Sequence, residues 1–305
     1  MSNEQLTSEQ SLAANGKSFH WARRFLGARM GRDAAGLYAF CRLLDDMADG
    51  DIDNGPTRLL AIREDLVAGR SGDDPALRAF LPLMAQKRFP AEVLVALIDG
   101  LLEDQADTVA LADESALLRY AYRVAGTVGL LMCHVLDCHA PAARAHAIDL
   151  GIAMQLTNIA RDVLEDAEMN RRYIPGDWVG GMAPAAITAA ARTPGSGGHG
   201  DVTVAVGRLL DMAETFYASG AQGYRYLPWR AHLSIAVAAR VYRQIGLQLR
   251  ATGCAWHEGR QVTSGLTKLR CSLPGLGSLG TRFGAASGAH DERLHLALRG
   301  LPYVA

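Results

Sequence analysis

Helical periodicity is the feature that most constrains how this chain can fold. Apolar residues recur at spacings of three and four along most of its length, whereas the alternating β-branched runs of strands are scarce. The pattern predicts an all-α protein with few strands or none. The predicted helices lie near residues 18–27, 32–49, 57–68, 75–86, 90–106, 114–137, 141–168, 201–221 and 229–251.

The chain shows no internal repeat and no shift in composition that would require a second domain. We therefore expect one domain over residues 16–272, preceded by a flexible N-terminus over 1–15. From Leu273 onward the sequence is rich in Gly, Ser and Ala, so 273–305 is predicted to be a loosely ordered tail. The Gly-rich segment 192–200 is predicted to be a mobile surface loop.

The composition is that of a soluble globular protein and excludes several other classes. Of 305 residues, 49% are hydrophobic and 21% are charged. A net charge of −1 provides no basic surface for nucleic acid. The five cysteines are odd in number and lack CxxC spacing, so we expect reduced thiols in a cytoplasm. The apolar stretch 124–136 is too short to cross a bilayer, and the polar N-terminus has no signal-peptide pattern.

A polar stripe interrupts the apolar helix predicted over 141–168. At about 100° per residue, Gln155, Asn158, Asp162 and Asp166 fall within about 80° of one another. The other faces are largely apolar, which indicates burial on most sides. Buried polar groups need partners, and two aspartates four residues apart repel each other. We therefore expect the stripe to face a cavity that holds positive charge.

A second helix repeats this arrangement in LYAFCRLLDDMADG, residues 37–50. Tyr38, Arg42, Asp45 and Asp49 share a stripe about 60° wide, and the remaining faces are apolar. Asp46 points about 100° away from Asp45 and is the weaker candidate. One such stripe could be a solvated helix face with ordinary ion pairs. Two stripes of similar geometry favour a shared site.

Carboxylates without histidine or cysteine select a hard cation such as Mg²⁺, which binds through one or two of them together with substrate phosphate. Nearby arginines could complete a diphosphate clamp. These are Arg42, Arg161, Arg171 and Arg172, of which Arg171 is most simply a surface charge. Arg161 and Glu165 are four residues apart and most simply form a flanking salt bridge.

Several other strings lack the context that their chemistry requires. A di-iron bundle needs two Glu-x-x-His pairs, and only Glu292 and His295 have that spacing. GKS at 16–18 lacks the first glycine of a phosphate loop, and GLGSLG at 275–280 lacks a βαβ unit. The pair His257–Glu258 lacks the second histidine of a zinc helix.

Five segments together resemble the squalene/phytoene synthase family, whose members join two prenyl diphosphates head to head. They are GKSF (16–19), LYAFCRLLDDMAD (37–49), YAYRVAGTVG (120–129), AMQLTNIARDVLEDAEMNRRYIP (153–175) and the pair Tyr242 and Arg260. The resemblance runs from about Lys17 to Arg260, and its second and fourth segments are long and specific. It implies a single-domain isoprenoid-synthase helical bundle around a central cavity.

The resemblance also implies roles for individual residues. Asp45 and Asp49 would form the first aspartate-rich motif and Asp162 and Asp166 the second, binding diphosphate through Mg²⁺ or Mn²⁺ with Asn158 as a further ligand. Tyr120 resembles a tyrosine of the second half-reaction, whereas its neighbour Tyr122 is expected to pack. Positions that resemble substrate contacts are Ser18, Phe19, Tyr38, Arg42, Gln155, Asn158, Arg161, Tyr242 and Arg260, together with Val124, Val128 and Met132 in the wall of the prenyl tunnel.

The resemblance is strongest to the bacterial phytoene synthases. It implies condensation of two geranylgeranyl diphosphates to phytoene through a cyclopropyl diphosphate, with no use of NADPH. The alternatives are a dehydrosqualene or presqualene-diphosphate synthase that uses farnesyl diphosphate, and an inactive assembly subunit, against which the intact aspartates argue. A terpene cyclase has different aspartate motifs. Lipid substrates are compatible with peripheral membrane contact and with contacts to other isoprenoid-pathway enzymes, and we expect no nucleic-acid partner.

Overall fold

The computed structural model describes residues 25–258 and 289–304. Within them the fold is helical, as predicted, and the strands β1 (Val109–Ala110) and β2 (Arg171–Arg172) form one short parallel pair. The helices are α3 (Ala28–Ala48), α4 (Gly55–Val67), α5 (Pro75–Lys87), α6 (Ala91–Glu103), α7 (Glu114–Ala121), α8 (Thr127–Val135), α9 (Ala143–Glu168), α10 (Pro184–Ala191), α11 (Gly197–Gln222) and α12 (Trp229–Ala251). Shorter helical turns are η1 (Tyr122–Gly126), η2 (Gly176–Trp178), η3 (Gly223–Tyr226), η4 (Trp256–Glu258) and η6 (Glu292–Leu298).

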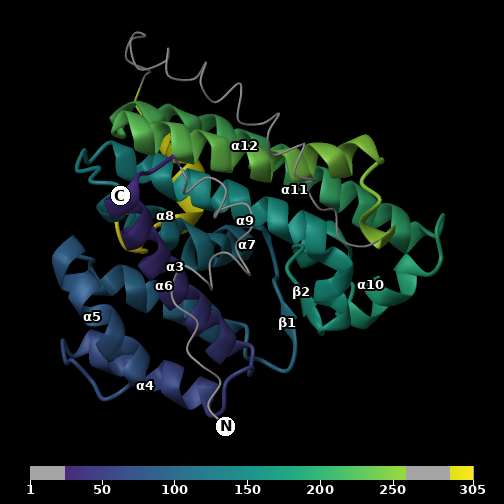
Figure 1. Cartoon of the computed structure of the whole chain (residues 1–305). Coiled ribbons are helices and arrows are strands. Elements are labelled where there is room, and N and C mark those ends of the chain that lie inside the picture. The colour runs from purple at the N-terminus through teal and green to yellow at the C-terminus, as the bar shows by residue number, and fades with distance from the viewer. Residues whose placement is uncertain (1–24, 259–288, 305) are drawn as a thin grey trace.

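Helix α9 passes through the middle of the bundle and contacts α8, α10, α11, α12 and η1. In Figure 1, α11 and α12 run along one side of α9, while α3 to α6 occupy the other side. The apolar residues Ile152, Leu156, Ile159 and Val163 are all buried. Burial on most sides is what the sequence predicted for this helix, and it makes α9 the element around which the core is organised.

Two glycines allow α9 to approach the preceding segment very closely. A Cβ atom at Gly129 would lie 2.2 Å from the carbonyl oxygen of Ala147, and one at Gly151 would lie 2.3 Å from that of Ala125. No real side chain tolerates such distances to backbone atoms, so the two backbones pack in direct contact. This packing fixes η1 and α8 against α9.

The helix predicted over 114–137 is interrupted. Its middle turn, η1, is a π-helix, which separates α7 from α8. A π-turn inserts one residue into otherwise continuous helix, so the flanks keep their helical periodicity and the sequence pattern does not reveal the break. The prediction of a single helix is therefore wrong at residues 122–126.

The predicted surface loop 192–200 is also partly wrong. Helix α11 begins at Gly197, because the Ser196 side chain accepts a hydrogen bond from the His199 amide at 3.3 Å and caps the helix. Helix α10 was not predicted. For the helix predicted over 18–27, residues 18–24 lie outside the described residues, and 25–27 are not helical.

The C-terminal segment 289–304 is packed rather than loosely ordered. Leu298 and His295, both in η6, are buried. Arg119 of α7 donates hydrogen bonds to the carbonyl oxygens of Ala297 and Arg299 at 3.0 and 3.1 Å. The predicted loose tail is therefore wrong for this segment, whereas 273–288 and the N-terminus 1–15 lie outside the described residues. The domain limits 16–272 stay a prediction.

The close approach of α9 gives a stability test. We expect Gly151→Ala to lower the free energy of unfolding by about 1–3 kcal/mol, the usual scale of overpacking, because the new methyl group meets a backbone carbonyl. Gly207→Ala in α11 is the matched control, since nothing lies within 4 Å of its Cβ position. That change should be neutral or stabilise by up to about 1 kcal/mol. Urea unfolding measures both, and an equal effect of the two substitutions would contradict the packing.

Candidate active site

The two polar stripes keep partial exposure within a bundle that is otherwise well buried. On α9, Gln155, Asn158, Asp162 and Asp166 are half-buried, although the residues between them are mostly buried. On α3, Tyr38, Arg42 and Asp45 are half-buried and Asp49 lies at the exposed end of the helix. Both stripes therefore follow the faces that the helical spacing predicted.

Asp104, the C-cap residue that follows α6, links the two stripes. Its carboxylate interacts electrostatically with Asp45 and Asp49 of α3 and with Asp166 of α9. It accepts hydrogen bonds from the hydroxyls of Tyr120 and Tyr173, each at 2.8 Å. Asp104 was not predicted from the sequence, because a single acid at a helix end belongs to no stripe and carries no spacing signal.

Arg171 is the positive charge between these carboxylates. It donates a hydrogen bond to Asp49 Oδ1 at 3.2 Å and another to the backbone carbonyl of Asp104 at 3.4 Å. The positive charge of Arg171 also acts to lower the pKa of Asp166, against burial and Asp162, which raise it. The interpretation of Arg171 as a surface charge is therefore wrong.

The turn after α9 explains the position of Arg171. Asn170 adopts a left-handed conformation with φ of 59°, which ends the helix. Its side chain donates hydrogen bonds to the Asp107 carbonyl and the Thr108 hydroxyl at 2.5 and 2.6 Å. The chain then pairs with β1 through Arg171 and Arg172, close to the end of α6.

Arg172 lines the same small cavity as Asp166 and Arg171, but its hydrogen bonds go to backbone groups. It is buried, and it donates hydrogen bonds to the backbone carbonyls of Leu111 and Ile174 at 2.8 and 2.6 Å. These hydrogen bonds hold the segment that follows β2 against the segment that follows β1. A contribution of Arg172 to a diphosphate clamp stays a prediction.

The other two arginines each engage an aspartate of their own helix. Arg42 bonds to Asp45 Oδ2 at 2.8 Å and also forms an ion pair with Asp46. Arg161 donates to Asp162 Oδ1 at 2.6 Å with a second contact to Oδ2. The salt bridge expected between Arg161 and Glu165 is thus replaced by the pair with Asp162.

The crowding of carboxylates perturbs their protonation. Burial and the neighbouring charge of Asp162 raise the pKa of Asp166 to about 8. Burial also raises the pKa of Asp104 to about 6, against the hydrogen bonds from Tyr173 and Tyr120. Partial burial, opposed by Arg42 and reinforced by Asp49, raises the pKa of Asp45 to about 6. A bound cation would relieve all three penalties.

Asn158 provides a further sign that this site fits a cation. Its side-chain nitrogen donates to Gln155 Oε1 at 3.5 Å, whereas its Oδ1 is buried and has no hydrogen-bond partner in the described part of the chain. A buried amide oxygen without a partner is costly. Together with the aspartate oxygens it forms a donor set that suits Mg²⁺ or Mn²⁺.

Two groups of tyrosines flank the stripes. Tyr120 is buried and stacks on Tyr173 with ring centroids 4.7 Å apart, while both hydroxyls bind Asp104. Tyr242 of α12 interacts electrostatically with Tyr38 and Arg161, so it joins the α3 and α9 stripes from a third helix. Tyr122 is fully buried and donates to the carbonyl of Pro302, which is the packing role predicted for it.

The predicted tunnel wall is divided by the π-turn. Val124 lies in η1, whereas Val128 and Met132 lie in α8. Val124 and Val128 are half-buried and Met132 is buried. Three predicted contacts, Ser18, Phe19 and Arg260, lie outside the described residues.

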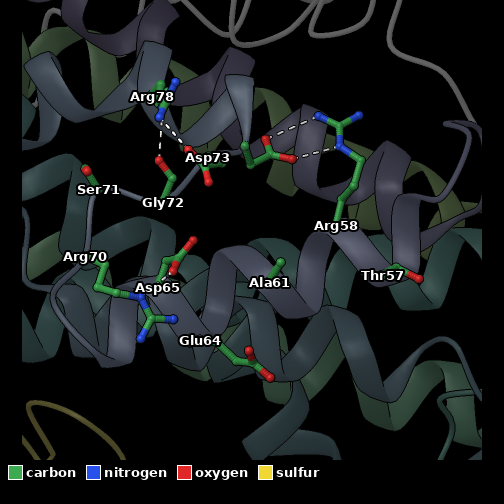
Figure 2. Close-up of a pocket in the computed structure, with 11 residues that line it drawn as sticks. Thr57, Arg58, Ala61, Glu64, Asp65, Arg70, Ser71, Gly72, Asp73 and Arg78 are labelled. Carbon is green, nitrogen blue, oxygen red and sulfur yellow. Dashed lines mark hydrogen bonds and ion pairs between the residues drawn. The ribbon is translucent and has the colours of Figure 1, made fainter.

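A surface hollow in the described ranges lies away from the stripes. It has a volume of about 820 Å³ and is formed by α4, α5 and the loop between them (Figure 2). Its three arginines pair with aspartates, as Arg58 with Asp74, Arg70 with Asp65 and Arg78 with Asp73. These pairs balance one another, so we do not assign a ligand to this hollow. A far smaller cavity borders Asp166, Arg171 and Tyr173.

Comparisons with known proteins agree with this geometry. A family model described as squalene/phytoene synthase matches residues 12–268. A 15-cis-phytoene synthase from a Paracoccus species is 36% identical over 300 residues, covering 91% of this chain and 96% of that protein. A phytoene synthase from Rhodobacter capsulatus is 37% identical, covering 76% and 69%. The crystal structure of a dehydrosqualene synthase in complex with a ligand has a TM-score of 0.78 at 26% identity, covering 90% and 95%, and confirms the predicted isoprenoid-synthase fold.

The pKa of Asp166 predicts how stability depends on pH without metal. The folded-state pKa of about 8 exceeds the ordinary value of 3.8, so the folded protein binds a proton that the unfolded chain has released. Stability should therefore fall as pH rises between those values, and Asp166→Asn should remove this loss. At pH 8 in chelator we expect the variant to melt at least about 3 °C above the wild-type protein, a gain that shrinks toward pH 4. Calorimetry at both pH values checks it, and a constant difference would contradict the assignment.

Proposed function

We infer that this chain, which belongs to the squalene/phytoene synthase family, is a prenyltransferase that condenses two geranylgeranyl diphosphates head to head. The reaction passes through a cyclopropyl diphosphate, releases diphosphate and yields phytoene for carotenoid biosynthesis. The observation that carries this conclusion is the 36% identity to a 15-cis-phytoene synthase across nearly the full length of both proteins. The relatives named phytoene synthase favour this product over the shorter-chain alternative.

Enzymes of this family generally use a divalent metal, and we propose Mg²⁺ or Mn²⁺ here. The residues that would hold it are Asp45, Asp49, Asn158, Asp162 and Asp166. When bound, the cation supplies positive charge that stabilises the diphosphate as it leaves. The unpartnered oxygen of Asn158 and the raised pKa values of Asp45 and Asp166 support this assignment.

The arginines complete the charge balance around the diphosphates. Arg42 and Arg161 form hydrogen bonds with Asp45 and Asp162, respectively, and so hold these carboxylates in place. Arg171 forms hydrogen bonds with Asp49 and with the backbone carbonyl of Asp104, and it interacts electrostatically with Asp166. Its positive charge can therefore stabilise negative charge between the stripes. Gln155, Tyr38 and Tyr242 are proposed to orient the substrate beside these groups, as are Ser18, Phe19 and Arg260.

Tyr120 suits a position beside a carbocation. Its hydroxyl hydrogen is committed to Asp104, so the oxygen offers electron pairs to its other neighbours. Stacking on Tyr173 and burial fix the ring. We therefore assign Tyr120 to the second half-reaction, in which the cyclopropyl diphosphate ionises and rearranges. Asp104 and Tyr173 act through Tyr120 as positioning residues.

The apolar segment Val124, Val128 and Met132 is proposed to line the space for the prenyl chains. Carbocations need a dry and unreactive surface, which aliphatic and thioether side chains provide. None of the helices in the described ranges is long and apolar enough to cross a bilayer. Peripheral contact with a membrane and with other isoprenoid-pathway enzymes stays a prediction.

A dehydrosqualene or presqualene-diphosphate synthase is the second candidate. The likeness in fold to a dehydrosqualene synthase is the observation that supports this second candidate. Both candidate reactions begin with the same condensation. The two candidates differ in the chain length of the substrate and in the mass of the product.

Product analysis separates these possibilities. Purified protein with Mg²⁺ should convert geranylgeranyl diphosphate to phytoene without NADPH, and adding NADPH should leave the product mass unchanged. Excess chelator should abolish turnover, and Mg²⁺ or Mn²⁺ should restore it. A product two mass units heavier that forms only with NADPH would indicate reductive chemistry. Preference for farnesyl diphosphate, or accumulation of the cyclopropyl diphosphate, would favour the second candidate.

Asp45 and Asp46 form a matched pair for testing the stripe, because both contact Arg42. We expect Asp45→Asn to reduce kcat by at least about 10²-fold, the scale of losing one electrostatic contact in a shielded site. Asp46→Asn should cost much less, since its carboxylate lies off the stripe. Steady-state kinetics with geranylgeranyl diphosphate measures both. Equal sensitivity would show that the stripe does not define the site.

A further inference from the structure

A second cluster of polar side chains lies near the start of α9, away from the aspartate stripes. Asp149 lies thirteen positions before Asp162 on α9, or about 20 Å away along the helix axis. Around Asp149 stand His146, one turn earlier on α9, Ser219 of α11, and His290 and His295 of the C-terminal segment. The phytoene synthase reaction, as assigned above, uses none of these residues.

The geometry of this cluster converges on the Asp149 carboxylate. His295 Nε2 lies 2.7 Å from its Oδ1, and His290 Nε2 lies 2.8 Å from its Oδ2. The Ser219 hydroxyl donates to Oδ2 as well and lies 3.4 Å from His146 Nδ1. Asp149 is completely buried, and His146 and His295 are also buried.

The donors are close enough to share one ion. Ligand atoms of His146, Asp149 and His290 all lie within 4.8 Å of one another. In a tetrahedral zinc site with bonds of about 2.0–2.1 Å, ligand atoms stand about 3.3 Å apart. Side-chain movements on the order of 1 Å would therefore bring these donors to that spacing. His295 stands outside this group of three, but its Nε2 lies 2.7 Å from Asp149 Oδ1, so after a larger movement it would supply the fourth ligand.

We propose that His146, Asp149, His290 and His295 bind a zinc ion that fastens the C-terminal segment 289–304 to α9. Imidazole nitrogens with one carboxylate are donors that suit zinc, in contrast to the oxygen donors of the aspartate stripes. Ser219 orients the carboxylate through its hydrogen bond, as outer partners of metal ligands commonly do. The ion would join two parts of the chain that are more than a hundred residues apart in sequence.

The location gives this zinc site a structural role in the bundle. The segment it fastens also contacts α7 through Arg119 and η1 through Tyr122. η1 carries Val124 of the proposed tunnel wall. Zinc should therefore stabilise the docked segment and the π-turn that it covers.

Metal analysis of the full-length protein tests the proposal. The protein is dialysed against zinc in excess Mg²⁺, which occupies the aspartate stripes, and the retained zinc is measured. We expect about one equivalent in the wild-type protein, with a rise in Tm of at least about 4 °C on adding zinc. His290→Ala should weaken zinc binding by at least about 100-fold and abolish the rise in Tm. Circular dichroism confirms that the variant folds.

His199→Ala is the matched control. His199 Nε2 lies 3.0 Å from His257 Nδ1, so this is also a histidine pair, but it stands outside the cluster around Asp149. The control should retain zinc as the wild-type protein does. No zinc retained by the wild-type protein, or equal retention by His290→Ala, would overturn the proposal and leave the cluster as a hydrogen-bonded contact. Because the readout is zinc content in Mg²⁺, the result does not depend on the product of the enzyme.

Discussion

Electrostatic repulsion among carboxylates that are largely shielded from solvent is the constraint on which this site depends. Asp45 and Asp49 come from α3, Asp104 from the end of α6, and Asp162 and Asp166 from α9. Burial raises the pKa values of Asp45, Asp104 and Asp166, and the negative charges of neighbouring aspartates add to the effect. A fold that holds such a cluster gives up stability in the absence of a counter-charge. The arrangement is useful because diphosphate chemistry brings divalent cations to the same place.

The rest of the bundle keeps these carboxylates from separating. α9 is packed on several sides, and glycines bring its backbone into direct contact with η1 and α8. The turn at Asn170 then directs Arg171 back toward Asp49 and Asp104. Tyr120 and Tyr173 complete the support of Asp104. Apolar packing thus provides the energy that holds a repulsive site together.

The sequence predicted what depends on helical spacing. The two stripes and the buried character of α9 follow from periodicity, because every fourth or third residue returns to the same face. Residues whose position depends on tertiary contacts were missed or misassigned. Asp104 lies at a helix end, and Arg171 is placed by a turn. The π-turn η1 could not be predicted, because it leaves the helical periodicity on either side intact.

The protonation of Asp166 tests the central claim most directly. Carbon-13 NMR of the aspartate carboxyl groups, with the Asp166 signal identified by its loss in Asp166→Asn, gives the pKa of this residue with and without Mg²⁺ and diphosphate. Without metal the signal should titrate near pH 8, the value expected for a buried carboxyl beside Asp162. With metal and diphosphate, Asp166 should be ionised throughout the range from pH 5 to 9, because a bound cation favours the charged carboxylate. Each unit by which the pKa falls corresponds to about 1.4 kcal/mol of interaction. An ordinary pKa near 3.8 in both states would contradict a repulsive carboxylate site that a cation completes.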